Sequence, residues 1–161
     1  MASREIGREG AEREIAFNRK ALHDYHVLEQ IEAGIALQGT EIKSLREGNV
    51  NVRDSYASVD RGEIWLLNLH VGPYSHTGYA SHEATRPRKL LLHRRQISAL
   101  TGKVAQTGIT LVPLRLYFKG SKVKVLLALA RGKQLHDKRE SIRRREIDRE
   151  TRAAVKAGSR R

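Results

Sequence analysis

Nearly all of the periodic hydrophobicity in this chain lies in residues 18–130, as short runs in which apolar and polar side chains alternate. A period of two is typical of strands that bury one face. Residues 25–37 form the clearest such run, and we expect a strand there with a bend or bulge at Gly34. The pattern favours one β-rich core over a helical bundle.

Turn signals divide the rest of this stretch. Asp60-Arg61-Gly62 predicts a hairpin between strands at 56–59 and 63–70. A second, longer hairpin is expected between residues 110–118 and 122–130. Pro113 removes one ladder donor, so its strand should lie at an edge or carry a bulge there.

Two helices are expected between the strands. One spans residues 40–46, with Thr40 as its cap and Gly48 as its stop. The other spans residues 93–104, and residues 71–88 read as a loop. We therefore predict a mainly β fold: an oligonucleotide-binding (OB) fold antiparallel barrel with two or three short helices and a basic C-terminal tail.

The two ends of the chain differ from this centre. Residues 1–17 alternate acids and arginines and read as a flexible leader, followed by the barrel over 18–130. Residues 131–161 hold twelve Lys and Arg against five Asp and Glu, more than half of the net charge of +13. This tail offers few apolar residues to a core, so we expect it to be disordered when free and helical when bound along RNA.

The charge points to a polyanionic partner. Nucleic acid is the first choice because Lys and Arg release counterions when they neutralise phosphates; an anionic membrane or an acidic protein are the rivals. The chain has no cysteine, its first fourteen residues lack the apolar centre of a signal peptide, and its longest apolar run, residues 125–130, is too short to span a bilayer. We expect a soluble, cytoplasmic and monomeric protein.

No chemistry-bearing motif is visible. The seven histidines match no familiar metal-ligand spacing, and no phosphate-cradling glycine loop, nucleophile elbow or carboxylate pair is found. We expect no catalytic site, no metal and no cofactor. The RNA-facing candidates are a basic cluster over residues 86–95 and three tyrosines that could stack on bases, Tyr25, Tyr74 and Tyr79.

Five segments resemble one bacterial family, the SsrA-binding proteins (small protein B), in order and with the family's spacing. They are residues 18–25 (NRKALHDY), 32–46 (EAGIALQGTEIKSLR), 54–56 (DSY), 86–92 (RPRKLLL) and 132–139 (GKQLHDKR). The similarity runs from Asn18 to Arg149. Ile147 stands where many members carry Trp.

The resemblance implies an OB-fold barrel that binds the tRNA-like domain of transfer-messenger RNA. Members carry this RNA into the vacant A site of stalled ribosomes, where the tail enters the mRNA channel near the decoding centre. The expected contacts to the tRNA-like domain are Asn18, Lys20, Tyr25, Glu32, Arg86, Arg88, Lys89 and Leu91. The expected ribosome-engaging residues are Lys133, His136, Asp137, Lys138, Arg139, Arg143, Arg144 and Arg145.

Two points stay open on the residues alone. Glu32 could accept hydrogen bonds from RNA or could orient a nearby Arg or Lys. Leu91 lies within a run of leucines, and the sequence alone favours core over RNA contact for it. A ribosomal protein or general RNA chaperone would explain the charge and the fold but not the long motifs. An RNA-processing enzyme would need a catalytic constellation that the sequence does not display.

Overall fold

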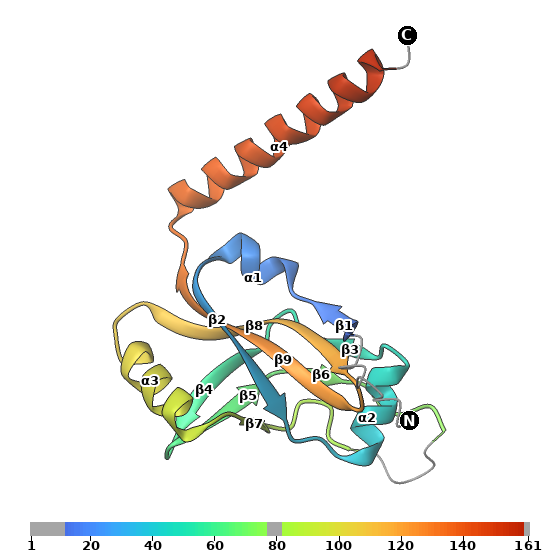
Figure 1. Cartoon of the computed structure of the whole chain (residues 1–161), viewed down its shortest axis with the longest axis vertical. Coiled ribbons are helices and arrows are strands. Elements are labelled where there is room, and N and C mark those ends of the chain that lie inside the picture. The colour runs from blue at the N-terminus through green and yellow to red at the C-terminus, as the bar shows by residue number, and fades with distance from the viewer. Residues whose placement is uncertain (1–11, 77–81, 160–161) are drawn as a thin grey trace, which may run out of the picture.

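The computed structural model describes residues 12–76 and 82–159. Nine strands and four helices succeed one another along the described chain (Figure 1). In order they are β1 (Glu12–Phe17), α1 (Arg19–Asp24), β2 (Tyr25–Ile35), α2 (Gly39–Arg46), β3 (Val50–Asn51), β4 (Tyr56–Asp60), β5 (Glu63–Leu67), β6 (His70–Val71), β7 (Arg88–Leu91), α3 (Arg94–Val104), β8 (Ile109–Lys119), β9 (Lys122–Gly132) and α4 (Leu135–Gly158). The expectation of a mainly β fold is confirmed.

Seven strands form one antiparallel sheet in the order β1-β8-β4-β5-β7-β2-β9, and β8 also pairs with β9. A separate two-stranded sheet joins β3 to β6. The interior contains aliphatic side chains from alternate positions of the strands, with Ile64, Leu66, Val125 and Leu127 fully buried. The period-two pattern of the sequence is therefore the inward face of this sheet.

Both predicted hairpins are present. Arg61 and Gly62 adopt φ values of 49° and 74° between β4 and β5, the left-handed pair that a two-residue hairpin turn requires. The second hairpin joins β8 to β9, and its register shifts between Pro113 and Arg115, which confirms the bulge at the proline. The segment expected as one strand over 63–70 is interrupted at Asn68, which has a φ of 58°.

The sequence predicts a bend or bulge at Gly34, and the register of β2 shows no bulge there. The register of β2 against β9 shifts instead between Val27 and Glu29, which leaves Leu28 half exposed. Gly34 serves close packing: a Cβ atom there would lie 3.2 Å from the Cβ of Leu91 on β7. The missing side chain lets β7 approach β2.

The helix expected over 40–46 begins one residue earlier, at Gly39, and its N-cap is Gln38 without a side-chain hydrogen bond. Thr40 is therefore not the cap. Gly48 follows the end of α2 with a φ of 75°, as the predicted stop requires. The second predicted helix is α3, whose Leu100 is buried while Ile97 and Val104 pack against the same core.

The boundary of the folded domain lies outside the predicted 18–130. Residues 12–17 belong to the sheet as β1, an edge strand paired with β8, and not to a flexible leader. Glu12 and Glu14 are exposed on β1, which has a partner strand on one side only. Edge strands commonly carry charged side chains, so the sequence of this segment is polar. At the other end, β9 continues to Gly132. Residues 1–11 of the predicted leader lie outside the described residues.

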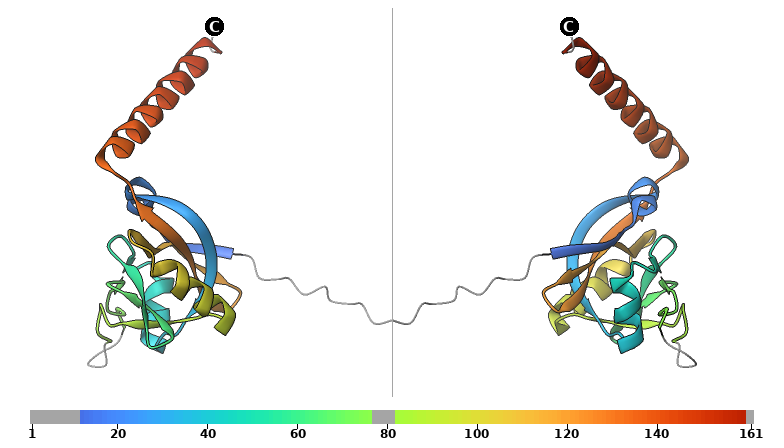
Figure 2. Two further views of the ribbon diagram at one scale, coloured as in Figure 1. Left: turned by 90° about the vertical axis from the view of Figure 1, so that its left-hand side faces the viewer. Right: turned by 90° about the vertical axis from the view of Figure 1, so that its right-hand side faces the viewer.

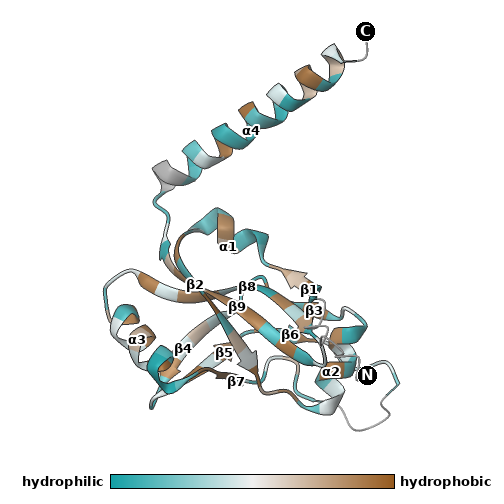
Figure 3. Ribbon diagram, viewed as in Figure 1, coloured by the Kyte–Doolittle hydropathy of each residue, from teal (hydrophilic) through white to brown (hydrophobic). Residues whose placement is uncertain are grey.

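The basic tail is a single helix, α4, of 24 residues (Figures 1 and 2). It leaves the sheet after β9 and projects away from the body, and Figure 3 shows it as mainly hydrophilic. Its apolar side chains Ile142, Ile147 and Val155 are exposed. A helix with so little packing is marginal in water, so its disorder without RNA stays a prediction that amide hydrogen exchange would test. Within the described residues no helix has the length and apolar character needed to cross a membrane.

Candidate RNA-binding surfaces

One shallow depression joins two residues that lie far apart in the sequence, Glu32 and Leu91. It lies where β2, the start of β9, the end of β7 and the start of α3 meet. We call it the Glu32 face. Its lining residues are Gln30, Ile31, Glu32, Gly34, Leu91, Leu92, His93, Gln96 and Lys124.

Hydrogen bonds from the protein fix the carboxylate of Glu32. The hydroxyl of Tyr117 donates to one carboxylate oxygen, and the Nζ of Lys119 lies 3.4 Å from both. The Tyr117 hydrogen bond is the main cause that lowers the pKa of Glu32, with Lys119 adding to it. Glu32 is therefore ionised at neutral pH and orients basic side chains, while its remaining acceptor positions are open to a ligand.

Tyr117 is itself nearly inaccessible to solvent. Burial first, and then the neighbouring Glu32 carboxylate, raises the pKa of its phenol, so the hydroxyl remains a donor at any physiological pH. The guanidinium of Arg115 lies 4.3 Å from the centre of the Tyr117 ring and pairs with Glu12 at 2.7 Å. A chain of contacts thus runs from β1 to the Glu32 face.

Leu91 is 52% exposed, which decides the question left by the sequence: it is a surface residue. An exposed leucine beside a fixed carboxylate and the lysine Lys124 offers apolar contact and charge in one place. Lys124 was missed by the sequence analysis. The pairing of Gly34 with Lys124 across β2 and β9 brings it here, and that register cannot be read from the local sequence.

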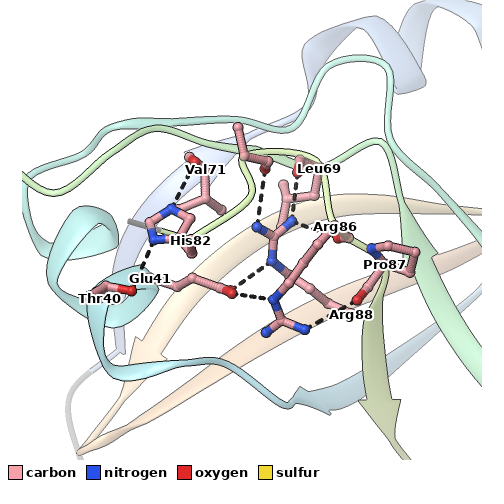
Figure 4. A network of polar contacts seen from close by, with 9 residues as sticks. Thr40, Glu41, Leu69, Val71, His82, Arg86, Pro87 and Arg88 are labelled. Carbon is pink, nitrogen blue, oxygen red and sulfur yellow. Dashed lines mark hydrogen bonds and ion pairs between the residues drawn. The ribbon is translucent and has the colours of Figure 1, made fainter. Parts of the chain in front are cut away.

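The first part of the basic cluster, residues 86–89, does not form a free cationic surface (Figure 4), whereas Arg94 and Arg95 in its second part are exposed at the start of α3. Arg88 is fully buried, and its Nε donates to the Glu41 carboxylate at 2.7 Å. Its other nitrogens donate to the backbone carbonyls of Leu69, Ala84 and Arg86. The prediction that Arg88 contacts RNA is therefore wrong.

The neighbours of Arg88 are also engaged. Arg86 donates from Nε to the second oxygen of Glu41 at 2.5 Å, and its side chain is 25% exposed. Lys89 pairs with Glu63 at 2.9 Å and remains 43% exposed. Glu41 is a buried carboxylate on α2, so this network ties α2 to β7 and to the segment before it. Among Arg86, Arg88 and Lys89, the side chain of Lys89 keeps the largest exposed fraction.

Three other predicted contacts, Asn18, Lys20 and Tyr25, gather around α1 at the far end of β2 (Figure 1). Asn18 is buried and caps α1: its Oδ1 accepts from the Ala21 amide. The Lys20 ammonium pairs with Asp54 at 2.6 Å. Tyr25 packs against a small cluster that contains Ala21 and Val112. Asn18 thus supports the surface around α1 from below, whereas Tyr25 is half-buried and lines a depression there.

Replacing Asn18 by alanine should lower the free energy of unfolding by about 2–3 kcal/mol. The change removes a helix cap and leaves the carbonyls of Val52 and Pro113, both acceptors from Nδ2, short of a donor. Denaturation followed by circular dichroism measures the loss. Gln106→Ala is the matched control, because Gln106 is exposed, its side chain makes no hydrogen bond within the described structure, and the change should alter stability by less than about 0.5 kcal/mol. Equal effects would contradict a structural role for Asn18.

The tail begins against α1. The amide of Lys133 donates to the Asp24 carbonyl at 2.8 Å, and its Nζ donates to the Leu22 carbonyl at 3.2 Å. Lys138 lies 3.5 Å from the Asp24 carboxylate. His23, and to a lesser degree Lys138, lower the pKa of Asp24, so this anchor is charged at neutral pH.

The remaining predicted tail residues follow on α4. His136 and Asp137 lie in its first turn, and their side chains fall outside the described part of the structure, as does Tyr79. Arg139, Arg143, Arg144 and Arg145 are exposed, and Arg144 pairs with Glu140 one turn before it.

Tyr74 contacts Lys43 and His76, which gives it a local packing role. Among the described residues, no three His, Asp or Glu side chains gather to hold a metal ion.

Comparison with known proteins gives a consistent result. The family model described as "SmpB protein" matches residues 15–157. The chain is 55% identical to the SsrA-binding protein of Carboxydothermus hydrogenoformans over 91% of this chain and 98% of that one. It is 59% identical to the SsrA-binding protein of Syntrophobacter fumaroxidans over 84% of each.

A solved chain with the same fold comes from work described as "tmRNA-SmpB: a journey to the center of the bacterial ribosome". The TM-score is 0.65 at 50% sequence identity, over 80% of this chain and 94% of that chain. The family model spans nearly all of the sheet and of α4. The chain therefore belongs to the SmpB family of SsrA-binding proteins.

Proposed function

We propose that this chain binds the tRNA-like domain of transfer-messenger RNA and delivers it to the A site of stalled ribosomes for trans-translation. The main support for the proposal is that the two candidate RNA-binding features, the Glu32 face and α4, lie apart from each other. The Glu32 face lies on the sheet, whereas the strongly basic α4 projects away from it. An adaptor between two RNAs needs such an arrangement, and the relatives are SsrA-binding proteins.

The sheet is best interpreted as a closed barrel of the OB type. The pairing of β8 with both β4 and β9 supports this, because it links the two sides of the strand order into a ring. A closed barrel removes exposed strand edges, and OB barrels commonly bind oligonucleotides on their strands and loops. In this view β1 is an added edge strand and the domain spans residues 12–132.

Recognition of the tRNA-like domain would use each part of the Glu32 face differently. Lys124 neutralises phosphate, and Leu91 packs against a base or ribose. The fixed carboxylate of Glu32 accepts from a ribose hydroxyl or a base amine, donors that a phosphate does not offer. The carboxylate thereby adds a contact to sugar or base that phosphate neutralisation alone does not provide. The chain acts by binding and makes no bond, and its proposed place of action is the cytoplasm.

In the same proposal the tail engages the ribosome. Residues 133–161 carry eleven Lys and Arg, and α4 presents most of them to solvent. Lys133 and Lys138 hold the start of the tail against α1. Arg139, Arg143, Arg144 and Arg145 are exposed and can meet phosphates along the mRNA channel, Arg144 by exchanging its surface pair with Glu140. His136 and Asp137 would lie at the decoding centre.

One binding experiment tests the proposal against a ribosomal protein or a general RNA chaperone. The affinity of the full chain is measured for a transcribed tRNA-like domain, an ordinary tRNA and an unstructured RNA at matched salt. We expect the tRNA-like domain to bind more tightly than the other two. Equal affinity for all three would favour the chaperone.

Replacing Tyr117 by phenylalanine should weaken binding of the tRNA-like domain several-fold while the ring keeps its packing. The variant loses the hydroxyl that orients Glu32, and a hydrogen bond to a charged group contributes about 1.5–3 kcal/mol. Fluorescence anisotropy measures the affinity. Tyr56→Phe, on an exposed tyrosine of β4, is the control and should bind as the parent does.

The same variant should also change the pH dependence of stability. The folded pKa of Glu32 lies below its usual value of 4.5, so the stability it contributes is present above about pH 4.5 and is lost as pH falls through the folded pKa. Removal of the Tyr117 hydroxyl raises that folded pKa. The parent and Tyr117→Phe should therefore differ in unfolding free energy at pH 7 and converge in acid. A constant difference would show that Glu32 is not involved.

A further inference from the structure

A cation lies over the aromatic ring that holds Glu32. Tyr117 reaches from β8 across β9 to the Glu32 carboxylate on β2, and its hydroxyl donates to one carboxylate oxygen. The guanidinium carbon of Arg115 lies 4.3 Å from the centroid of the Tyr117 ring. The strand registers set Arg115 opposite Leu126 on β9, and Leu126 opposite Glu32, so these side chains share one face of the sheet.

Arg115 acts on the hydroxyl that donates to Glu32. A cation over an aromatic face is attracted to the π electrons and draws electron density from the ring, which makes a phenol a stronger hydrogen-bond donor. Burial and the Glu32 carboxylate raise the pKa of Tyr117, and the charge of Arg115 opposes them. The guanidinium also limits the positions that the ring can take, because it lies against one ring face. Arg115 therefore affects both the strength and the direction of the hydrogen bond to Glu32.

Glu12 on β1 holds Arg115 in this place. The two side chains pair at 2.7 Å, and they are 42% and 28% exposed. Solvent screens a pair with that much exposure, so it contributes little to stability. The family model begins at residue 15, so Glu12 lies outside the part of the chain that the family model matches. Support of Tyr117 explains the pair better than stabilisation of β1 does.

The groups that face the Glu32 carboxylate directly are titratable or cationic side chains of three elements. They are Tyr117 and Lys119 on β8, Lys124 on β9 and His93, the N-cap of α3. The Tyr117 hydrogen bond is the largest of the causes that lower the pKa of Glu32, and the two lysines add to it. Arg115 acts on the ring and not on the carboxylate, so its effect on Glu32 passes through the Tyr117 hydroxyl.

We propose that Arg115 is a positioning residue for RNA recognition, which sets the Glu32 carboxylate through the hydroxyl of Tyr117. In this arrangement β1 supports the recognition surface from the edge of the sheet, through two side chains of β8. Arg115 itself touches no RNA. The inference rests on the proposed function, in which Glu32 meets the tRNA-like domain.

A double-mutant cycle tests this route in the full chain. Arg115→Met keeps the apolar stem but removes the charge, and it is measured alone and together with Tyr117→Phe. The first measurement is the pKa of the Glu32 carboxyl, by NMR titration of protein with ¹³C-labelled glutamate and without RNA. Glu32→Gln identifies the signal. The second measurement is the affinity for a transcribed tRNA-like domain.

Arg115→Met alone should raise the pKa of Glu32 and weaken binding of the tRNA-like domain about threefold, within the range that a cation–π contact provides at a partly exposed site. When Arg115→Met is added to Tyr117→Phe, neither the pKa nor the affinity should change further, because the hydroxyl that transmits the effect is already missing.

Arg13→Met is the matched control. Arg13 is exposed on β1, and its partner across the strands is Phe118 and not Tyr117, so its side chain leaves the sheet on the opposite face. The change removes the same charge from the strand beside Arg115. It should leave the pKa of Glu32 as it is and the affinity within about 1.5-fold, because an exposed charge at a distance is screened.

Three outcomes would overturn the inference. An unchanged pKa of Glu32 in Arg115→Met would remove the route through Tyr117. A loss of affinity that persists in the Tyr117→Phe background would show that Arg115 meets the RNA directly. An equal loss in Arg13→Met would reduce the effect to net charge. Failure of the proposed function would be seen separately, as equal binding of the unaltered chain to the tRNA-like domain and to ordinary tRNA, whereas the NMR titration needs no RNA.

Discussion

Replacing Glu41 by glutamine should lower the free energy of unfolding by about 3–5 kcal/mol, the largest effect on stability that we expect from a single change. The carboxylate of Glu41 is fully buried and pairs with both Arg86 and Arg88. The glutamine has nearly the same shape but leaves the guanidinium of Arg88 buried without a counter-charge. Breaking a buried pair by removing one partner is costly for this reason.

The control is the exposed pair of Lys89 and Glu63, whose side chains are both more than two-fifths exposed. Glu63→Gln should cost less than about 1 kcal/mol, because solvent screens an exposed pair. Chemical denaturation of the three proteins gives the comparison. The double change Glu41→Leu/Arg88→Met should cost less than the sum of the two single changes, because each single change alone leaves the other charge buried without its partner. A Glu41→Gln protein as stable as Glu63→Gln would refute the account of this network.

The Glu41 network also shows where sequence reasoning fails. Arg88 stands among Arg86, Pro87 and Lys89 in a segment that reads as a basic surface loop. Its burial depends on Glu41, 47 residues earlier, and on carbonyls of a loop that has no pattern of its own. The local sequence shows that Arg88 is charged, but it does not show which acidic residue pairs with it. A buried ion pair between distant segments is therefore invisible until the fold brings the partners together.

The strands that bury one face were the easiest to predict. β2, β8 and β9 follow the period of two, and the turn at Arg61-Gly62 needs only the left-handed conformation that its sequence suggests. β1 was missed because an edge strand with both glutamates exposed resembles a polar leader. The site was half predicted: Glu32 and Leu91 came from resemblance, whereas Lys124 and Tyr117 depend on the register of β2, β8 and β9.

Deleting residues 133–161 should abolish peptide tagging on stalled ribosomes while leaving affinity for the tRNA-like domain within about twofold. The cut falls after Gly132, because β9 pairs with Tyr25 up to that residue and an earlier cut would remove sheet contacts. The deletion takes eleven Lys and Arg and five Asp and Glu with it. A reconstituted translation system with truncated mRNA measures tagging, and anisotropy measures RNA binding. Tagging that persists would refute the role assigned to the tail.

The charge and the helix of the tail can be separated. Thr151→Pro keeps every charge but interrupts α4, at a cost of about 3 kcal/mol in helix interiors. Thr151→Ala is the matched control, because it removes the γ-methyl group and the hydroxyl that donates to the Ile147 carbonyl but keeps the backbone amide that proline lacks. If the ribosome requires a helix, the proline variant should lose most tagging and the alanine variant none. If the charge of the tail suffices, both variants should tag normally. The body should be unaffected in either variant, because α4 packs so little on it that the helix matters only when RNA lies along it.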